Sequence, residues 1–453
     1  MSASEIPAYA DRLHSAAAAA RERLERSPVE RWEIYAKASF TREVEVAPSA
    51  PLRVIEVEET GVAVRSLREA RMGFAAASGL GNDASRRAVE GALAAETGVD
   101  GDPLPPRRLL GTSEVGPSRA LPPRGWATHA GQELARAVAD LSGNHLRLRR
   151  AIFQEGAFGW ILATGDGWVA RHEDVSTTLL AEVEAVDDRS GVWRDWVHIA
   201  DPDTFDLEAA AARITDRALL TRSRVATDSG LRDLILHPEV SAQLLAAMAP
   251  LFLATPETED LLPPLLDGEG RLASSALTLV DDRRDWEAPL TGPCDGEGIP
   301  ARRTLLLDEG VPRHRVASFR DARRCGETPR GGAVRLSYRD YPAPGIANLK
   351  VLNGEGVPAS ELLGAADRAL YLLRPLAPVS CRPLDDSYRI VASGVWLDGR
   401  QVRGWHPVVE LKGSLGRLLR RIEVVGTDLR WFQAERGCVG APSLLIRRQA
   451  VIA

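Results

Sequence analysis

The residues with the types best suited to metal chemistry are His237 and Glu239, at the start of an apolar stretch near the middle of the chain. A zinc-peptidase helix carries two histidines about one turn apart on one face, with a glutamate beside the first that activates the metal-bound water. Here Pro238 follows His237, and the positions four and five residues beyond His237 hold Ser241 and Ala242, which do not bind zinc. Proline in the first turn and an acidic residue near the helix dipole are typical of an ordinary helix start, which is our preferred interpretation.

Cysteine offers one further candidate ligand. A metal set made of His237, Glu239 and Cys438 stays open as an alternative, but a lone histidine with a glutamate two residues later is a poor chelate, and a packed thiol is the simpler interpretation of Cys438. No other pair of histidines has the spacing that places two ligands on one helix face. The cysteines are far apart and form no CxxC pair, which predicts free thiols in a reduced, cytoplasmic protein.

The amino-acid composition indicates a soluble protein and argues against nucleic-acid and membrane partners. The chain has 453 residues, of which 44% are hydrophobic and 26% are charged, as in soluble proteins with packed cores. The net charge of -6 gives no electrostatic case for nucleic-acid binding. No apolar run is long enough to span a membrane, and the N-terminal residues lack the apolar core of a signal peptide. We therefore expect neither a nucleic acid nor a membrane as partner.

The elements that must position these residues are a mixture of helices and strands. Alternation from residue 32 to 40, then short segments at 41–46, 52–58, 61–68 and 71–76, predict an antiparallel meander of short strands. Helices are predicted over 6–26, 82–95, 128–141, 206–221, 238–252 and 360–373. Asp398-Gly399 is the strongest hairpin signal in the chain.

This order of elements predicts an α+β fold with antiparallel sheets. We expect an N-terminal α/β sandwich-like domain at 1–97, a Pro/Gly-rich linker or loop at 98–126, and a middle helix and strand segment at 127–220. A larger C-terminal β-rich domain, barrel or sandwich-like, is expected at 221–453. No dinucleotide-binding, Walker or GxSxG motif is present.

Several blocks of sequence resemble the TldD/PmbA family, whose members were named as modulators of DNA gyrase. The resemblance is carried by the set of blocks in the same order along nearly the whole chain rather than by a single motif. These blocks are residues 43–46, 58–65, 71–75, 86–93, 277–282, 295–304, 342–349, 392–396, 424–430 and 439–446.

The family has two branches, and the departure at His237-Pro238-Glu239 decides between them. TldD-like chains resemble zinc metallopeptidases with HExxxH on a central helix and a cysteine ligand near the C-terminus. TldE (PmbA)-like chains lack the motif and pair with a TldD-like chain. The resemblance therefore implies a TldE-like subunit of a heterodimeric peptidase, with no catalytic or metal-binding residue of its own and with zinc in the partner chain.

What the resemblance implies for substrates is a peptide or peptide-like amide, held in a cleft that this subunit completes. Altered loops at 98–125 and 325–332 favour a variant of this hypothesis in which the pair matures a peptide-like natural product. The alternative is a stand-alone binding or regulatory protein without a hydrolytic partner. Five residues in the resembling or neighbouring loops are candidates for substrate or partner contact: Arg323, Arg324, Tyr341, Asn348 and Asp428.

Overall fold

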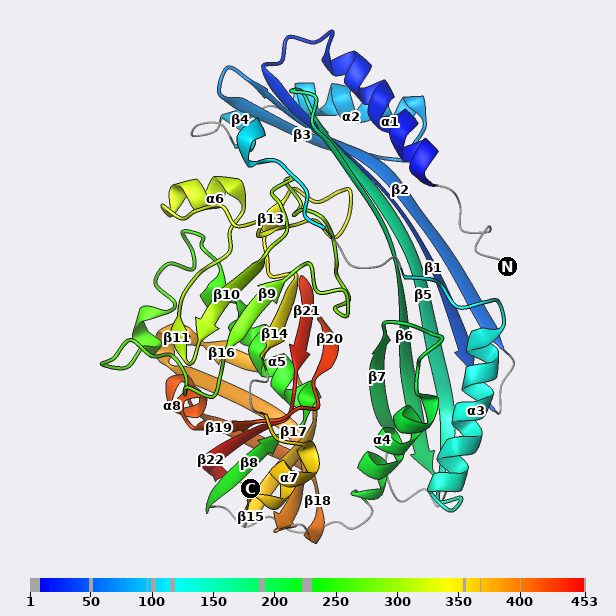
Figure 1. The fold of residues 1–453 in the computed structure, drawn as a ribbon, viewed down its shortest axis with the longest axis vertical. Coiled ribbons are helices and arrows are strands. Elements are labelled where there is room, and N and C mark those ends of the chain that lie inside the picture. The colour runs from blue at the N-terminus through cyan, green and yellow to red at the C-terminus, as the bar shows by residue number, and fades with distance from the viewer. Residues whose placement is uncertain are drawn as a thin grey trace.

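The computed structural model describes residues 9–48, 52–95, 97–98, 103–114, 119–186, 192–221, 230–352, 356–366, 368–399 and 401–451. A long curved sheet from the first half of the chain runs along one side of the molecule, and the second half lies within its concave side (Figure 1). The fold is mixed α+β with mostly antiparallel pairing, which confirms the predicted class. No helix of the described residues has the length and apolar character needed to cross a membrane.

The curved sheet has seven strands in the order β4-β3-β2-β1-β5-β6-β7, and all neighbours are antiparallel. Its strands are β1 (Arg31–Val46), β2 (Arg53–Arg68), β3 (Arg71–Ser78), β4 (Thr97–Gly98), β5 (Leu146–Thr164), β6 (Val169–Ala185) and β7 (Trp193–Ile199).

The prediction of short strands before residue 76 was wrong in one respect. The segments at 32–40 and 41–46 form one strand, β1, and those at 52–58 and 61–68 form one strand, β2. Glu59 and Thr60 were left between two predicted strands and Gly61 was predicted to start the second, but all three lie inside β2. The ring of Tyr338 packs against the backbone of Gly61. A glycine within a strand is typical of such a close approach.

Four helices cover parts of this sheet (Figure 1). Near one end, α1 (Tyr9–Leu24) and α2 (Asn82–Ala94) pack Ala and Leu side chains onto β1 and β2. Near the other end, α3 (Trp126–Leu141) and α4 (Leu207–Leu219) share a hydrophobic core with β5, β6 and β7.

The predicted linker is partly described. Residues 103–114 contain the short 3-10 helix η2 (Arg107–Leu109), and Leu104 and Leu110 in this segment are buried. The segment therefore lies on the body of the protein as a surface-hugging loop. The strands predicted in the middle segment, 127–220, join the same sheet as β1 to β3.

The second half contains two larger sheets and a two-stranded ribbon. The first sheet, in spatial order, is β11 (Val311–Pro312), β10 (Arg303–Asp308), β9 (Leu279–Asp282), β14 (Asn348–Val351), β21 (Gly437–Ala441) and β20 (Arg430–Ala434). The second is β16 (Ser380–Arg382), β17 (Ser387–Asp398), β15 (Arg368–Pro375), β8 (Gly230–Leu236), β22 (Leu444–Val451) and β19 (Ile422–Val425), with β18 (Gln401–Ser414) beside β17. The ribbon is β12 (Ala333–Val334) and β13 (Ala343–Pro344).

The helical elements of this half are shorter. They are α5 (Pro238–Met248), η3 (Ala249–Phe252), η4 (Pro263–Leu265), α6 (Phe319–Arg324), α7 (Ala359–Gly364), η5 (Pro383–Asp385) and α8 (Leu415–Arg420). The largest hydrophobic core joins α5 to both sheets.

Two predictions in this half have opposite outcomes. The hairpin at Asp398-Gly399 is confirmed, because β17 and β18 pair around it and Gly399 has a φ of +55°. The single helix over 360–373 was wrong: α7 ends at Gly364 and β15 begins at Arg368. The strand β15 lies between β8 and β17 and buries side chains on both faces, so its continuous apolar run resembles a buried helix.

Candidate functional site

The helix α5 starts as the sequence predicted. His237 is its N-cap residue, and the Nδ1 atom of His237 accepts the backbone N–H of Glu239 at 3.2 Å. Pro238 occupies the first helical turn, where its missing N–H costs nothing. His237 thus caps a helix, and the ring nitrogen that faces the helix is already used.

A guanidinium group lies beside this helix start. The Nη1 atom of Arg217, in the last turn of α4, is 3.3 Å from His237 Nε2, 3.4 Å from Glu239 Oε2 and 3.6 Å from Asp195 Oδ1. Arg430 Nη2 also contacts Asp195 Oδ1, at 2.8 Å. Because Asp195 and Arg217 belong to the first half of the chain and His237, Glu239 and Arg430 to the second, this cluster joins the two halves.

Burial, together with nearby arginines, lowers the pKa of His237 and keeps its imidazole neutral. Burial lowers the pKa of His237 well below its ordinary value, and the nearby Arg217 adds to the effect. Burial raises the pKa of Glu239, while Arg217 acts in the opposite direction. The cluster therefore stabilises a neutral histidine next to a cationic arginine, and an arginine occupies the space beside the two candidate ligands.

A cavity of about 390 Å³ lies on another side of α5. Its walls are α5 and η3 on one side, the hairpin of β20 and β21 on another, and residues 344–346 and 378–379. Most of the lining is aliphatic, and polar atoms come from Gln243, Gln433 and Cys438 among others. Burial raises the pKa of Cys438 to about 12, so its thiol stays protonated at neutral pH.

The HExxxH motif can be aligned with α5 in two ways, and the cavity distinguishes between them. With His237 at the first histidine position, the second falls on Ala242, which is buried in the core. With Glu239 at the glutamate position, the two histidine positions fall on Pro238 and Gln243, and Gln243 lines the cavity together with Cys438. The second register therefore places one histidine position on the wall of the cavity that Cys438 also lines, whereas the register that starts from His237 places it in the core.

Neither register supplies a zinc site. Proline has no ligand atom, and an amide is not among the usual zinc ligands, so Pro238, Gln243 and Cys438 do not fit the metal. In the part of the chain that the structure describes, no group of three His, Cys, Asp or Glu side chains could hold a metal ion. The alternative set of His237, Glu239 and Cys438 is likewise not assembled among these residues.

A second, more polar cavity of about 460 Å³ lies near the turn between β20 and β21. Glu435 and Arg436 of that turn line both cavities. Its other walls are the loop between β12 and β13, including Arg339, Asp340 and Tyr341. An apolar and a charged cavity thus lie on either side of one hairpin turn.

The structure does not bring the five predicted contact residues together. Tyr341 lines the second cavity and packs edge-on against Phe74, with ring centroids 5.4 Å apart. Arg323 and Arg324 are exposed at the end of α6.

The other two residues have structural partners. Asn348 is fully buried, and its side-chain amide donates to the carbonyl of Asp282 at 3.0 Å. The carboxylate of Asp428 accepts the backbone N–H of Ser443 at 2.9 Å and its hydroxyl at 2.7 Å. Substrate or partner contact by any of the five stays a prediction.

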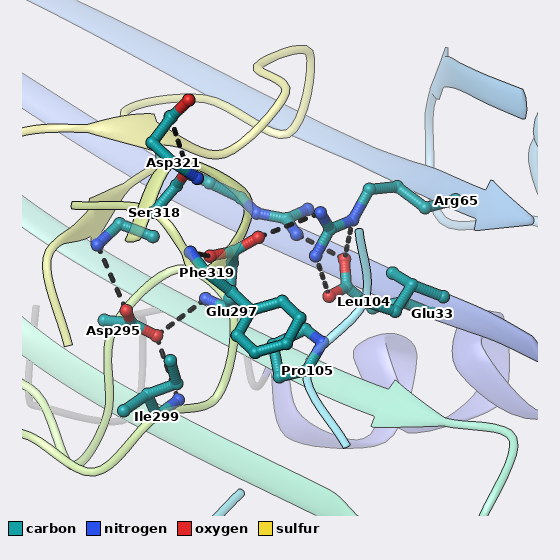
Figure 2. A network of polar contacts seen from close by, with 12 residues as sticks. Glu33, Arg65, Leu104, Pro105, Asp295, Glu297, Ile299, Ser318, Phe319 and Asp321 are labelled. Carbon is teal, nitrogen blue, oxygen red and sulfur yellow. Dashed lines mark hydrogen bonds and ion pairs between the residues drawn. The ribbon is translucent and has the colours of Figure 1, made fainter. Parts of the chain in front are cut away.

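A buried ionic network connects the curved sheet to the second half (Figure 2). Arg65 of β2 binds both carboxylate oxygens of Glu33 in β1, at 2.9 and 2.5 Å, and its Nη1 is 3.1 Å from Glu297 Oε1. Arg335 also binds Glu33, and the backbone N–H of Phe319 donates to Glu297 Oε2 at 2.7 Å. All four charged side chains are at most 2% exposed.

The network stabilises the negative charge of Glu33 more than that of Glu297. Burial alone would raise the pKa of Glu33, but Arg335 and Arg65 hold it below its usual value. Burial raises the pKa of Glu297 to about 7, against the opposing effect of Arg65. Neighbouring Asp295 accepts backbone N–H groups from Glu297, Ile299 and Ala333 and so shapes the loop that carries Glu297. Residues 295–300, part of the resembling block 295–304, therefore help to position the second half on the sheet.

Sequence reasoning missed Arg217, Asp195 and Gln243. The spacing of Gln243, five residues after Pro238 with Glu239 between them, was a signal that could have identified Gln243. Nothing in the local sequence connects Arg217 or Asp195 to α5, because that proximity depends on how α4 and β7 pack.

The structure is a mixed α+β fold in which helix α5 carries no zinc-binding set among the described residues. Residues 229–453 match the family described as PmbA/TldA metallopeptidase C-terminal domain. The structure is similar to that of TldE from Thermococcus kodakarensis, with a TM-score of 0.79 and 17% identity, covering 96% of this chain and 100% of that one. A putative modulator of a DNA gyrase from Thermotoga maritima gives a TM-score of 0.74 at 17% identity, covering 97% and 100%.

Curated relatives match over shorter segments. A metalloprotease from Synechocystis is 29% identical over 34% of this chain and 35% of its own length. An uncharacterized protein from Methanocaldococcus jannaschii is 29% identical over 30% of this chain and 33% of its own length. The matches thus span about a third of these relatives. The family-model match shows that residues 229–453, the C-terminal half of the chain, belong to the TldD/PmbA family, and the solved structures show that nearly the whole chain shares their fold.

Proposed function

We propose that this chain is a TldE-like, non-catalytic subunit that pairs with a TldD-like chain and completes the cleft in which that chain's zinc centre hydrolyses peptides or peptide-like amides. The observation that carries the proposal is which residues α5 has at the positions of the zinc motif. The helix keeps a glutamate at position 239 and borders a cavity that contains Cys438, yet Pro238 and Gln243 stand where the motif requires histidines.

The cavity beside α5 suggests what this subunit contributes. A volume of about 390 Å³ with a largely aliphatic lining suits an apolar side chain of a substrate. In the charged cavity on the other side of the hairpin turn, Arg436 and Glu435 can bind polar groups of the same substrate peptide. We infer that the hairpin of β20 and β21 helps to select peptide segments, with zinc and the general base supplied by the partner.

Co-expression with a chain from the same genome that carries HExxxH tests the proposal. We expect a stable heterodimer that hydrolyses unfolded peptides and contains about one zinc per pair, bound to the partner. Full peptidase activity of the HExxxH chain alone would overturn the proposal, as would a failure of the two chains to associate.

The cavity has its own test within that complex. Replacing Ala247 by tryptophan fills the cavity, and we expect slower hydrolysis of peptides with apolar side chains while the heterodimer remains intact. Ala94→Trp, at an exposed position at the end of α2, is the matched control. Equal activity of the two variants would exclude the cavity from substrate binding.

A further inference from the structure

Half of strand β2 is an open edge of the curved sheet. The strand pairs with β1 from Arg53 to Leu67, but with β3 only from Gly61 onward. Residues 53–60 therefore have a strand neighbour on one side. On the other side, the carbonyl of Thr60 accepts the N–H of Gly79 at 2.8 Å, and within the described residues no backbone hydrogen bond reaches the outer side of residues 53–59.

This edge lacks several of the features that protect an edge strand. Folded proteins prevent unwanted pairing with charged side chains, proline, bulges or very short edges, and of these the edge has charged side chains alone. Residues 53–60 contain neither proline nor lysine, and their pairing with β1 has no register shift. Val54 is 50% exposed and Val57 is 56% exposed, so apolar side chains face solvent on both faces of the edge.

Other edges of the same molecule show the contrast. The edge strand β18 contains Pro407 and Lys412 and has two register shifts against β17. The edge strand β20 is covered by β7, where Arg430 Nη2 binds the carbonyl of Trp196 at 2.6 Å. An exposed, regular and partly apolar edge is a site for pairing with another strand.

The charge of the edge indicates what kind of strand it binds. It carries Glu56, Glu58 and Glu59 against a single Arg53. Arg12 pairs with Glu58 at 3.0 Å and Arg339 pairs with Glu59, whereas Glu56 is exposed without a partner among the described residues. A second copy of this acidic edge would be repelled, and a strand with lysine or arginine would be attracted.

We propose that residues 53–60 bind an edge strand of the partner subunit by β-addition, and that this strand carries a basic residue opposite Glu56 and apolar residues beside Val54 and Val57. The inference rests on the proposed function, because the partner is the HExxxH-bearing chain. Backbone hydrogen bonds supply affinity, and the side chains of the edge select the partner. The pairing would extend the curved sheet of this chain into the second subunit.

Binding of the purified HExxxH chain to edge variants, measured by analytical ultracentrifugation, tests the inference. We expect Glu56→Lys and the double variant Val54→Lys/Val57→Lys to raise the Kd of the heterodimer about tenfold or more. The control is Val402→Lys/Val408→Lys on β18, where both valines are exposed, and it should bind as the wild type does. Thermal melting of each chain alone verifies that the variants are folded.

Amide hydrogen exchange gives a second readout in the wild-type proteins. Among residues 53–59, the amides that point away from β1 should exchange rapidly in the isolated chain and become protected in the heterodimer. If the heterodimer forms without this protection and the edge variants bind normally, residues 53–60 do not bind the partner. That result would refute the inference and leave the proposed function unaffected. Protection already present in the isolated chain and lost on deleting residues 1–8 would show that the chain's own N-terminus is the occupant, and would also refute the inference. No association of the wild-type chains would refute both.

Discussion

Tyr338 packs so closely on Gly61 that a Cβ atom at Gly61 would lie 2.2 Å from the ring carbon Cε2 of Tyr338. Tyr338 is 2% exposed, and the guanidinium of Arg339 lies 4.6 Å from its ring centroid. A glycine in the middle of β2 thus marks the point where the second half of the chain contacts the curved sheet. The contact between β2 and the segment that carries Tyr338 depends on the absence of a methyl group at position 61.

Replacing Gly61 by alanine should therefore destabilise the protein. The new methyl group would overlap a buried ring, and overpacking of this kind typically costs about 1–3 kcal/mol. Chemical denaturation of Gly61→Ala measures the loss. Gly98→Ala is the control, because a Cβ at Gly98 meets nothing within 4 Å. Tyr338→Leu in the same chain should recover part of the loss, and a Gly61→Ala variant as stable as the wild type would contradict the contact.

Removing Arg65 should have a larger effect. Arg65 is 1% exposed and binds both Glu33 and Glu297, so Arg65→Met leaves the buried Glu297 without its arginine partner and Glu33 with Arg335 alone. Breaking a buried ion pair in this way typically costs about 3–5 kcal/mol. Urea denaturation compares this variant with Arg12→Met, which breaks an exposed pair with Glu58 and should change stability much less. Similar losses in the two variants would show that the network contributes little.

His198 should make the protein less stable in mild acid. Burial lowers the pKa of His198 to about 4, and both ring nitrogens lack hydrogen-bond partners among the described residues. In the unfolded chain the imidazole has a pKa of about 6.5. As the pH falls from about 6.5 to about 4, the unfolded state takes up a proton that the folded state does not, so stability decreases by on the order of 2 kcal/mol.

The variant His198→Leu tests this pH dependence. Denaturation between pH 7 and pH 4.5 should show a smaller loss of stability in His198→Leu than in the wild type. His129→Leu, at an exposed position on α3, controls for the removal of an imidazole. The same pH slope in His198→Leu and the wild type would be evidence against a buried neutral His198.

The register assigned to α5 predicts how a zinc site could be built. Pro238→His with Gln243→His installs HExxxH around Glu239, with position 243 on the wall of the cavity that Cys438 also lines. We expect the double variant to bind close to one equivalent of zinc by metal analysis, because two histidines and a cysteine form a usual zinc set.

Two further variants make this test specific. Adding Cys438→Ser should weaken zinc binding strongly. Ala242→His, which completes the register that starts from His237, should bind little zinc because position 242 is in the core. Tighter zinc binding by Ala242→His than by the double variant would reverse the assigned register.

Local features of the fold could be predicted where neighbouring residues decide them. The start of α5 follows from Pro238 and Glu239, and the hairpin of β17 and β18 follows from Asp398-Gly399. The helix expected over 360–373 failed because β15 is buried on both faces, and burial removes the alternation that identifies a strand. The break expected between the strands at 52–58 and 61–68 does not occur. Gly61 lies inside β2 because its backbone packs against Tyr338, which is in a distant part of the sequence.

The sequence by itself determined that α5 lacks the histidines of a zinc helix and that the net charge of -6 gives no electrostatic case for nucleic-acid binding. These properties depend on residue type and spacing, which folding does not alter. Only the tertiary structure decided that Arg217 lies against His237 and Glu239, that Gln243 shares a cavity with Cys438, and that half of β2 is an open edge. Each of these depends on packing between elements that are distant in the chain, and packing contacts of this kind leave no periodic signal in the local sequence.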